Sequence, residues 1–183
     1  MNLDQADIVW WNAFKDGSRE AFDNLFRRYY PILTQYGSKI STDRELLDDV
    51  IQDLFVELWQ SRSATPVLSV KAYLFRSLKY KLFRHFKNQR NSEAPSEMSD
   101  AYAFTLSHES FIIQKEDEHA KVSMITDAIN RLPARQKEII YLKIYQNMSY
   151  EEVSEVMNIN YQVARNLFYQ SIKSLRSLLG TKE

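Results

Sequence analysis

Very few residues in this chain can interrupt a helix. Its 183 residues include only three glycines and four prolines, the two residue types that most often end helices and make the tight turns between strands. A β-rich fold would need such a turn after nearly every strand, because strands are short. The scarcity of both residues therefore predicts an all-α fold built from a few long helices.

Apolar residues recur at three- and four-residue spacing along most of the sequence, which is the period of amphipathic helices. This pattern predicts two helices between residues 6 and 39, interrupted at residues 16–18, where Asp16 or Ser18 can cap the second helix. A third helix is predicted over residues 42–59, opened by a capping box of Thr42 and Glu45. A fourth is predicted over residues 69–90, capped by Ser69.

Helical periodicity is lost between residues 91 and 110, where Ser, Glu, Pro and Asp accumulate. Such a composition is typical of linkers. The chain is therefore predicted to consist of two small helical domains, residues 1–90 and 116–183, joined by a flexible acidic linker over residues 91–115.

The C-terminal region combines a short capped helix, a tight turn and a longer helix. Ser149 and Glu152 form a second capping box, residues 158–160 make the turn, and the last helix is predicted over residues 161–179. This is the layout of a helix-turn-helix, whose second helix lies in the major groove of DNA. An ordinary helical hairpin has the same spacing, so DNA binding is favoured but not decided. The core between the helices is predicted to contain Val153, Met157, Ile159, Val163 and Leu167.

The formal net charge is zero, but the charges form blocks of opposite sign. Residues 71–90 contain seven cations and no acid, and residues 41–60 contain six acids and one arginine. Cations interleaved with aromatic side chains are typical of surfaces that bind single-stranded nucleic acid, although about three of the five aromatics in 71–90 are expected in the core. Asp49, Asp53 and Glu57 follow one another at four-residue spacing, so they form an acidic stripe that fits either a cationic partner or an ordinary solvated surface.

No feature of the sequence indicates an enzyme, a cofactor or a metal site. The chain has no cysteine, no glycine-rich phosphate loop and no nucleophile motif. Glu116 and His119 have the spacing of half a di-metal site, but such a site needs the pattern twice. No signal peptide and no membrane-spanning apolar run are recognised, so a cytoplasmic protein without membrane contact is expected.

The motifs of the C-terminal region follow one another in a familiar order. This order begins with Leu132-Pro133 and an apolar helix, continues with the segment from Ser149 to Val153 and a turn, and ends with Val163 and Leu175-Arg176. It resembles the promoter-reading domain of extracytoplasmic-function (ECF) sigma factors of the sigma-70 family. The resemblance implies that the last helix contacts the upstream (minus-thirty-five) promoter element through Gln162, Arg165, Asn166, Tyr169 and Lys173. Asn158 stands where the family often has glycine, and asparagine tolerates the left-handed backbone of such a position.

The N-terminal half carries two further motifs of the same family. The segment ELLDDVIQDLFVELWQ is similar to the helix that docks on the clamp of the largest subunit of core RNA polymerase, which implies contacts from Asp48, Asp49, Gln52, Asp53, Glu57 and Trp59. The segment SVKAYLFRSLKYKLFRHF resembles the promoter-melting segment, with Tyr80 where many members carry asparagine. Together with the loop over residues 60–68, it implies minus-ten contacts from Ser61, Arg62, Ser63, Lys71, Tyr73, Arg76, Lys79, Tyr80 and Arg84.

The resemblance as a whole implies a sigma factor that directs core RNA polymerase to specific promoters. Its partners would be core RNA polymerase and promoter DNA, and an anti-sigma protein is a further partner because family members are often held inactive by one. The alternative is a helix-turn-helix regulator whose N-terminal half is a sensor or dimerisation domain. That alternative shares the C-terminal motifs but predicts neither the acidic stripe nor the basic-aromatic helix.

Overall fold

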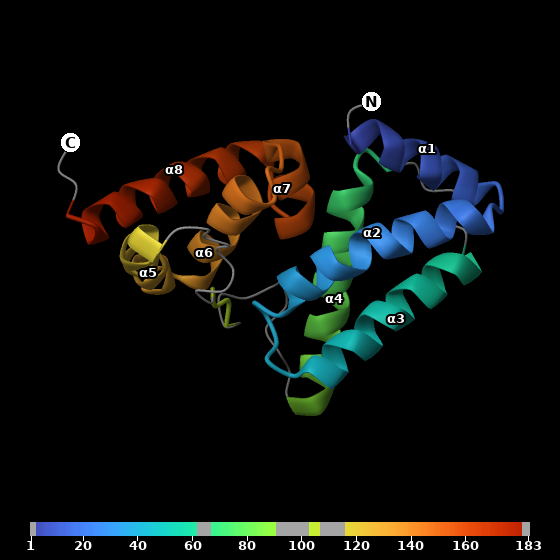
Figure 1. Ribbon diagram of the computed structural model, residues 1–183, viewed down its shortest axis with the longest axis horizontal. Helices are drawn as coiled ribbons and strands as arrows, with labels where there is room; N and C mark the ends of the chain where they lie inside the picture. The colour runs from blue at the N-terminus through green and yellow to red at the C-terminus, as the bar shows by residue number, and fades with distance from the viewer. Residues whose placement is uncertain (1–2, 62–66, 91–102, 107–115, 181–183) are drawn as a thin grey trace. The chain divides into compact units, whose positions relative to one another are not determined.

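The computed structural model describes residues 3–61, 67–90, 103–106 and 116–180, and within these ranges every regular element is a helix (Figure 1). The predicted all-α fold with two helical units is therefore confirmed. The first unit contains α1 (Leu3–Lys15), α2 (Arg19–Gly37), α3 (Arg44–Ser61) and α4 (Val70–Arg90). The C-terminal half contains α5 (Glu116–Asn130), α6 (Ala134–Ile140), the π-helical turn η2 (Tyr141–Tyr145), α7 (Tyr150–Met157) and α8 (Tyr161–Leu178).

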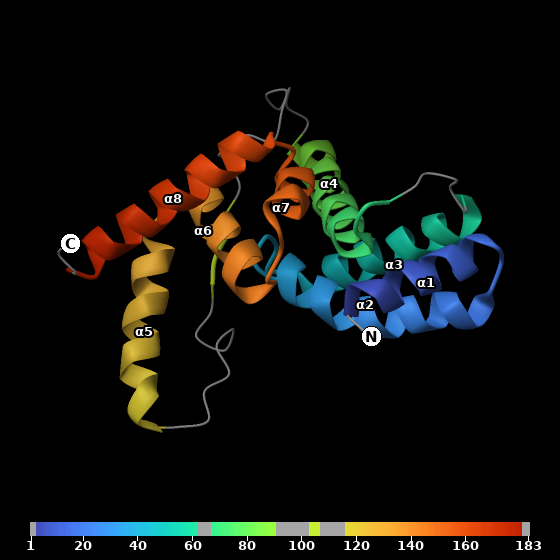
Figure 2. The ribbon, with the colours of Figure 1, turned by 90° about the horizontal axis from the view of Figure 1, so that it is seen from above.

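Helix α2 lies at the centre of the first unit and contacts α1, α3 and α4 (Figures 1 and 2). Its apolar residues fall at three- and four-residue spacing, so a single stripe of α2 meets all three neighbours. The apolar side chains of this core that are at most 1% exposed come from all four helices: Phe14, Leu25, Tyr29, Leu33, Tyr36, Leu47, Ile51, Ala72, Leu74, Phe75, Leu78 and Leu82.

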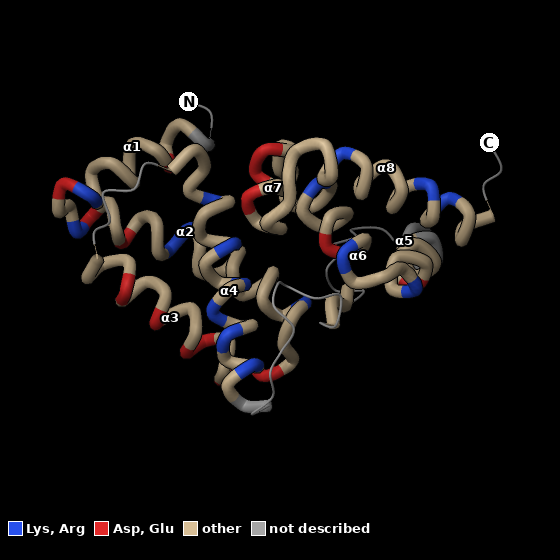
Figure 3. The backbone as a smooth tube through the Cα atoms, turned by 180° about the vertical axis from the view of Figure 1, so that it is seen from behind, with Lys and Arg blue, Asp and Glu red and all other residues tan. Residues whose placement is uncertain are grey.

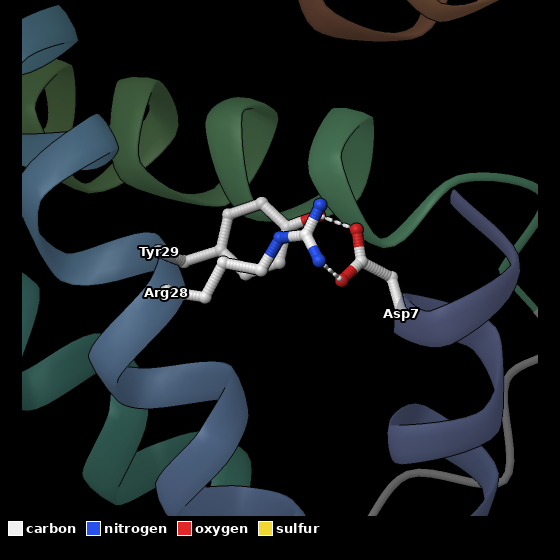
Figure 4. Close-up of polar contacts among 3 residues, drawn as sticks. All are labelled: Asp7, Arg28 and Tyr29. Carbon is white, nitrogen blue, oxygen red and sulfur yellow. Dashed lines mark hydrogen bonds and ion pairs between the residues drawn. The ribbon is translucent and has the colours of Figure 1, made fainter. Parts of the chain in front are cut away.

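A buried polar cluster fixes α1 against α2 (Figure 4). Asp7 is only 3% exposed, and both of its carboxylate oxygens have partners. Tyr29 donates its hydroxyl to Oδ2 at 2.5 Å, and Arg28 Nη1 lies 3.1 Å from Oδ1. A carboxylate in this setting is tolerated only when it is paired in this way. The cluster joins residues 22 positions apart, and the helical periodicity gave no indication of it.

The helix caps follow the sequence closely, with one exception. Ser18 accepts a hydrogen bond from Ala21 N at 3.2 Å, and Ser69 accepts one from Ala72 N at 3.2 Å, so both predicted caps are confirmed. Helix α3 begins at Arg44, and its cap is Asp43, whose Oδ1 accepts from Leu46 N at 3.0 Å. The predicted capping box of Thr42 and Glu45 is therefore wrong by one residue, because the neighbouring carboxylate offers the backbone the same acceptor.

Gly37 allows α2 and α3 to approach closely at the C-terminal end of α2. A Cβ atom added at this position would lie 2.3 Å from Leu47 Cδ1, and Leu47 is itself 1% exposed. Glycine is therefore needed at this position because the Leu47 side chain leaves no room for a Cβ atom, and not because of the backbone conformation of residue 37.

Replacing Gly37 with alanine is expected to destabilise the protein by about 1–3 kcal/mol, because an added methyl group must displace a packed side chain. Urea unfolding followed by circular dichroism measures this loss. In a Leu47→Ala background the space is open, so the same Gly37→Ala change should cost clearly less. An equal cost in both backgrounds would contradict the steric explanation.

The C-terminal half extends further towards the N-terminus than the sequence indicated. Phe104 and Leu106 are 0% and 1% exposed, and Phe104 packs on Tyr141 with ring centroids 5.8 Å apart. The side chain of Asn130 accepts from Leu106 N at 3.0 Å and donates to Leu106 O at 2.7 Å. Phe104 and Leu106 thus belong to a packed core, although they fall in the predicted linker. The rest of that range, residues 91–102 and 107–115, lies outside the described residues.

The apolar helix that follows Leu132-Pro133 is observed in two parts. Pro133 is the N-cap residue, α6 ends at Ile140, and the chain continues as the wider turn η2. Gln146 Nε2 donates to Tyr141 Oη at 2.9 Å, and burial raises the pKa of Tyr141 to about 12. Asn147 then adopts a positive φ of 49°, which ends the helix and leads the chain into α7.

Candidate nucleic-acid and protein interfaces

Four residues set the path of the chain from the start of α7 to the start of α8. Ser149 N donates to Glu152 Oε2 at 2.7 Å while Glu152 N donates to Ser149 Oγ at 3.2 Å, which confirms the capping box that opens α7. Asn158 has the expected left-handed backbone, with φ of 52°. Asn160 Oδ1 then accepts from Val163 N at 2.8 Å and starts α8. These local bonds produce a helix, a tight turn and a second helix, the predicted helix-turn-helix.

The packing of α8 in this motif differs from the prediction at one position. Tyr150 of α7 meets Tyr161 and Phe168 of α8, with ring centroids 5.8 and 6.1 Å apart. Ala164 is fully buried, whereas Val163 is 42% exposed and does not belong to the core. The correction follows from the helical period, because neighbouring residues point about 100° apart and the small alanine occupies the inward direction.

The outward face of α8 carries all five predicted DNA-contacting residues. Gln162, Arg165, Asn166, Tyr169 and Lys173 are all exposed, and they line a groove of about 850 Å³ along the helix. Gln162 Nε2 donates to Asn166 Oδ1 at 3.1 Å, and the Arg165 guanidinium lies 5.9 Å from the Tyr161 ring. Helix α8 contains cations and no acidic residue, as Figure 3 shows. This combination of amides, guanidinium and cations suits base edges and phosphates.

The acidic stripe of α3 is on the surface of the first unit. Asp49, Asp53 and Glu57 are exposed, as is Gln52, and the acids are visible along α3 in Figure 3. Asp48 differs from them, because it is half-buried and accepts a hydrogen bond from Tyr30 Oη at 3.0 Å. This bond raises the pKa of Tyr30 above its usual value. Trp59 is also half-buried and packs on Phe22 with ring centroids 5.0 Å apart.

An apolar groove beside the acidic stripe was missed in the sequence. It has a volume of about 550 Å³ and lies between α2 and α3, where it is lined by Phe22, Phe26, Phe55, Val56 and Trp59 with polar residues around them. Val56 is 51% exposed. The only signal in the sequence was a pair of aromatic residues at four-residue spacing on each helix, a pattern that more often belongs to a core.

The basic-aromatic helix α4 exposes fewer of its residues than predicted. Arg76, Tyr80 and Arg84 are exposed, with Tyr80 at 64%, and Lys71 and Tyr73 are half-buried. Lys79 is only 2% exposed, so its side chain is turned away from the surface, and its minus-ten contact stays a prediction. It stands four residues after the buried Phe75, and the period of the helix therefore turns it inward.

The aromatic residues of α4 correct a second expectation. Of the five, Phe75 alone is fully buried, Tyr73, Phe83 and Phe86 are half-buried, and Tyr80 is exposed. Tyr73 packs on Trp11 with ring centroids 5.3 Å apart. Three of the five were expected in the core, but only one of them is fully buried.

Some predicted residues lie outside the part of the chain that the structure describes. Ser61 is exposed at the end of α3, but Arg62 and Ser63 fall in the undescribed range. The side chains of Glu116 and His119 in α5 are likewise outside it. Among the described residues, no group of three His, Cys, Asp or Glu side chains could hold a metal ion, and no helix could cross a membrane.

Two families match separate parts of the chain. Residues 25–92 match the family described as Sigma-70 region 2, and residues 123–175 match the family described as Sigma-70, region 4. The first match contains the acidic stripe and the basic-aromatic helix, and the second contains the helix-turn-helix.

Full-length relatives of both families are similar to the chain. RNA polymerase sigma factor CarQ of Myxococcus xanthus is 24% identical, over 93% of this chain and 95% of the relative. RNA polymerase sigma factor CnrH of Cupriavidus metallidurans is 22% identical, over 98% of this chain and 97% of the relative.

Solved structures share the fold. CnrH in complex with the cytosolic domain of CnrY has a TM-score of 0.63 at 18% identity, covering 97% of this chain and 99% of that one. The sigma factor RpoE in complex with the anti-sigma factor NepR from Bartonella quintana has a TM-score of 0.60 at 18% identity, covering 88% and 98%. At these identities the structures show a common fold.

Proposed function

The chain belongs to the ECF group of the sigma-70 family of RNA polymerase sigma factors, and we therefore propose how its helices divide the recognition of a promoter. As a sigma factor it directs core RNA polymerase to specific promoters. The observation that supports our division of roles is the separation of charge. The acids of α3 and the cations of α4 and α8 lie on three different helices, so each helix suits one partner.

Helix α3 is proposed as the docking surface for core RNA polymerase. Asp49, Gln52, Asp53 and Glu57 supply exposed acceptors, and the adjoining apolar groove offers Val56 and Trp59 to the same partner. A helix with a basic edge and an apolar face would satisfy both features. Asp48 has a different role in this proposal: through Tyr30 it holds α2 to α3 beneath the stripe.

Helix α4 is proposed to bind the minus-ten strand after it separates. Arg76 and Arg84 are exposed cations for phosphates, and the exposed ring of Tyr80 offers a stacking platform for a base. Tyr73 and Lys71, half-buried at the start of the helix, would contact the same strand from its edge. Ser61, Arg62 and Ser63 remain proposed contacts for one flipped base.

Helix α8 is proposed to read the minus-thirty-five element as duplex DNA. Gln162, Arg165 and Asn166 lie in the first turns of the helix, which is where a recognition helix meets base edges. Tyr169 and Lys173 follow on the same face, towards the phosphates. We propose that the domain containing α8 begins at or before Ala103. The first domain is proposed to comprise residues 1–90.

This function also places the factor among its partners in the cell. The factor makes no covalent change itself, because polymerase supplies the chemistry, and it would act in the cytoplasm with the polymerase. Two of the fold's neighbours were solved in complex with proteins that bind them, and we propose that an anti-sigma protein can hold this factor in the same way. The regulator with an N-terminal sensor is not favoured, since residues 25–92 match Sigma-70 region 2.

Transcription in vitro tests the proposed function directly. The full-length protein is added to core RNA polymerase of the host with genomic DNA, and transcript start sites are mapped by sequencing. We expect start sites that depend on the protein and share a two-part sequence upstream. Start sites that do not change on addition of the protein would contradict the function.

A further inference from the structure

One ion pair connects the acidic helix to the basic one. Lys81 Nζ of α4 lies 2.6 Å from Glu57 Oε1 of α3. The Glu57 side chain is 66% exposed, whereas that of Lys81 is 20% exposed. The lysine stem is therefore packed between the helices, and its charge reaches the surface at the carboxylate.

The pair lies on the wall of a small cleft. The cleft has a volume of about 420 Å³ and is lined by apolar residues of α3, by Tyr73 and Ser77 of α4, and by Glu57 and Lys81. Ser61, the last residue of α3 and a proposed minus-ten contact, lines it as well. Lys81 therefore stands among the residues proposed above to hold the separated strand, although its charge is neutralised by Glu57.

Each member of the pair belongs to a different interface. Glu57 is the last acid of the stripe proposed to dock on polymerase, and Lys81 is one of the cations of the helix proposed to bind DNA. Cations of the polymerase would compete with Lys81 for the same carboxylate. Phosphates would compete with Glu57 for the same ammonium group.

We propose that Lys81 is a further phosphate-binding residue, which Glu57 holds back in the free factor and releases when polymerase binds Glu57. The proposal rests on the docking and strand-binding roles given above. It couples the two interfaces, because each partner removes a competitor of the other, and such coupling is equal in both directions. The Glu57 side chain is largely exposed and its ion pair is therefore screened by solvent, so the coupling is expected to be about two- to fivefold.

The first test measures the binding of the free, full-length factor to a fluorescein-labelled single-stranded DNA of mixed sequence. Glu57→Gln is expected to raise this affinity about two- to fivefold, because Lys81 becomes available. One added phosphate contact should also steepen the plot of log affinity against log salt concentration by about 0.7. Asp53→Asn is the matched control, since it removes the same charge one turn away, from an exposed residue that forms no ion pair with the described residues of α4.

The second test measures the affinity of the same variants for core RNA polymerase. Lys81→Gln is expected to raise this affinity about two- to fivefold, because Glu57 no longer has a competitor. Equal DNA binding by the Glu57→Gln and Asp53→Asn variants would overturn the proposal, since only a long-range charge effect would remain. No gain for Lys81→Gln would overturn it too. A different outcome would contradict the docking role of α3 itself: neither Glu57→Gln nor Asp53→Asn weakens polymerase binding.

Discussion

Reversing the charge of Asp49 and Asp53 together, to lysine, is expected to lower the affinity of the factor for core RNA polymerase at least a hundredfold. Both side chains are exposed at four-residue spacing on α3, so they would face the same basic surface. Placing like charges opposite each other at an interface costs several kcal/mol of binding free energy. Each 1.4 kcal/mol lost lowers the affinity about tenfold. Fluorescence anisotropy of labelled factor with core enzyme measures the change.

A second double reversal provides the matched control for this experiment. Asp16, in the turn between α1 and α2, and Glu20, in the first turn of α2, are also exposed acids of the first unit. Changing both to lysine alters the net charge by the same amount. We expect the control to retain affinity within a few-fold of the unchanged protein. Equal loss in both variants would show that net charge alone governs binding, and no loss in either would place the docking surface elsewhere.

The isosteric pair of substitutions refines the same prediction. Asp49→Asn with Asp53→Asn removes attraction without adding repulsion, so the loss should be smaller, about tenfold. Circular dichroism should show an unchanged helix content, because Asp49 and Asp53 lie outside the core. A smaller loss of affinity in the asparagine variant than in the lysine variant is expected only when the two carboxylates face positive charge.

The features predicted well from the sequence depend on neighbouring residues. The capping box of Ser149 and Glu152 joins residues three apart, and the left-handed turn at Asn158 depends on the residue itself. The acidic stripe needed only the helical period. Local hydrogen bonds and periodicity are sufficient for such elements, so most helices and the helix-turn-helix could be placed before the structure was known.

The features that were missed depend on distant residues. Lys79 and Val163 were misplaced because the side of a helix that faces the core is decided by the elements packed against it. Phe104 and Leu106 lie in an apparently featureless segment, and their burial depends on Asn130 and Tyr141, more than twenty residues later. The apolar groove likewise needs the aromatics of α2 and α3 to be neighbours. A charge count along one helix contains none of this information.

The largest expected effect in the C-terminal half comes from replacing Arg165 and Asn166 together with alanine. We expect promoter-specific transcription to fall at least thirtyfold, because each base contact that is lost costs about 1–3 kcal/mol. Both side chains are exposed in the first turns of α8, and truncating them leaves the buried contact at Ala164 unchanged. Transcripts from the strongest mapped promoter, made with saturating factor, measure the loss.

Two further variants separate base reading from phosphate binding. Lys173→Ala should weaken duplex binding for all sequences alike and reduce the salt slope by about 0.9, as expected for one lost phosphate contact. Arg131→Ala removes an exposed cation of the same half outside α8, so it should leave promoter choice and transcript level unchanged. If the Arg165 and Asn166 double variant keeps the promoter preference of the unchanged factor, α8 does not read the bases. Sequence choice would then depend on α4, because that helix carries the other exposed cations proposed to meet the promoter.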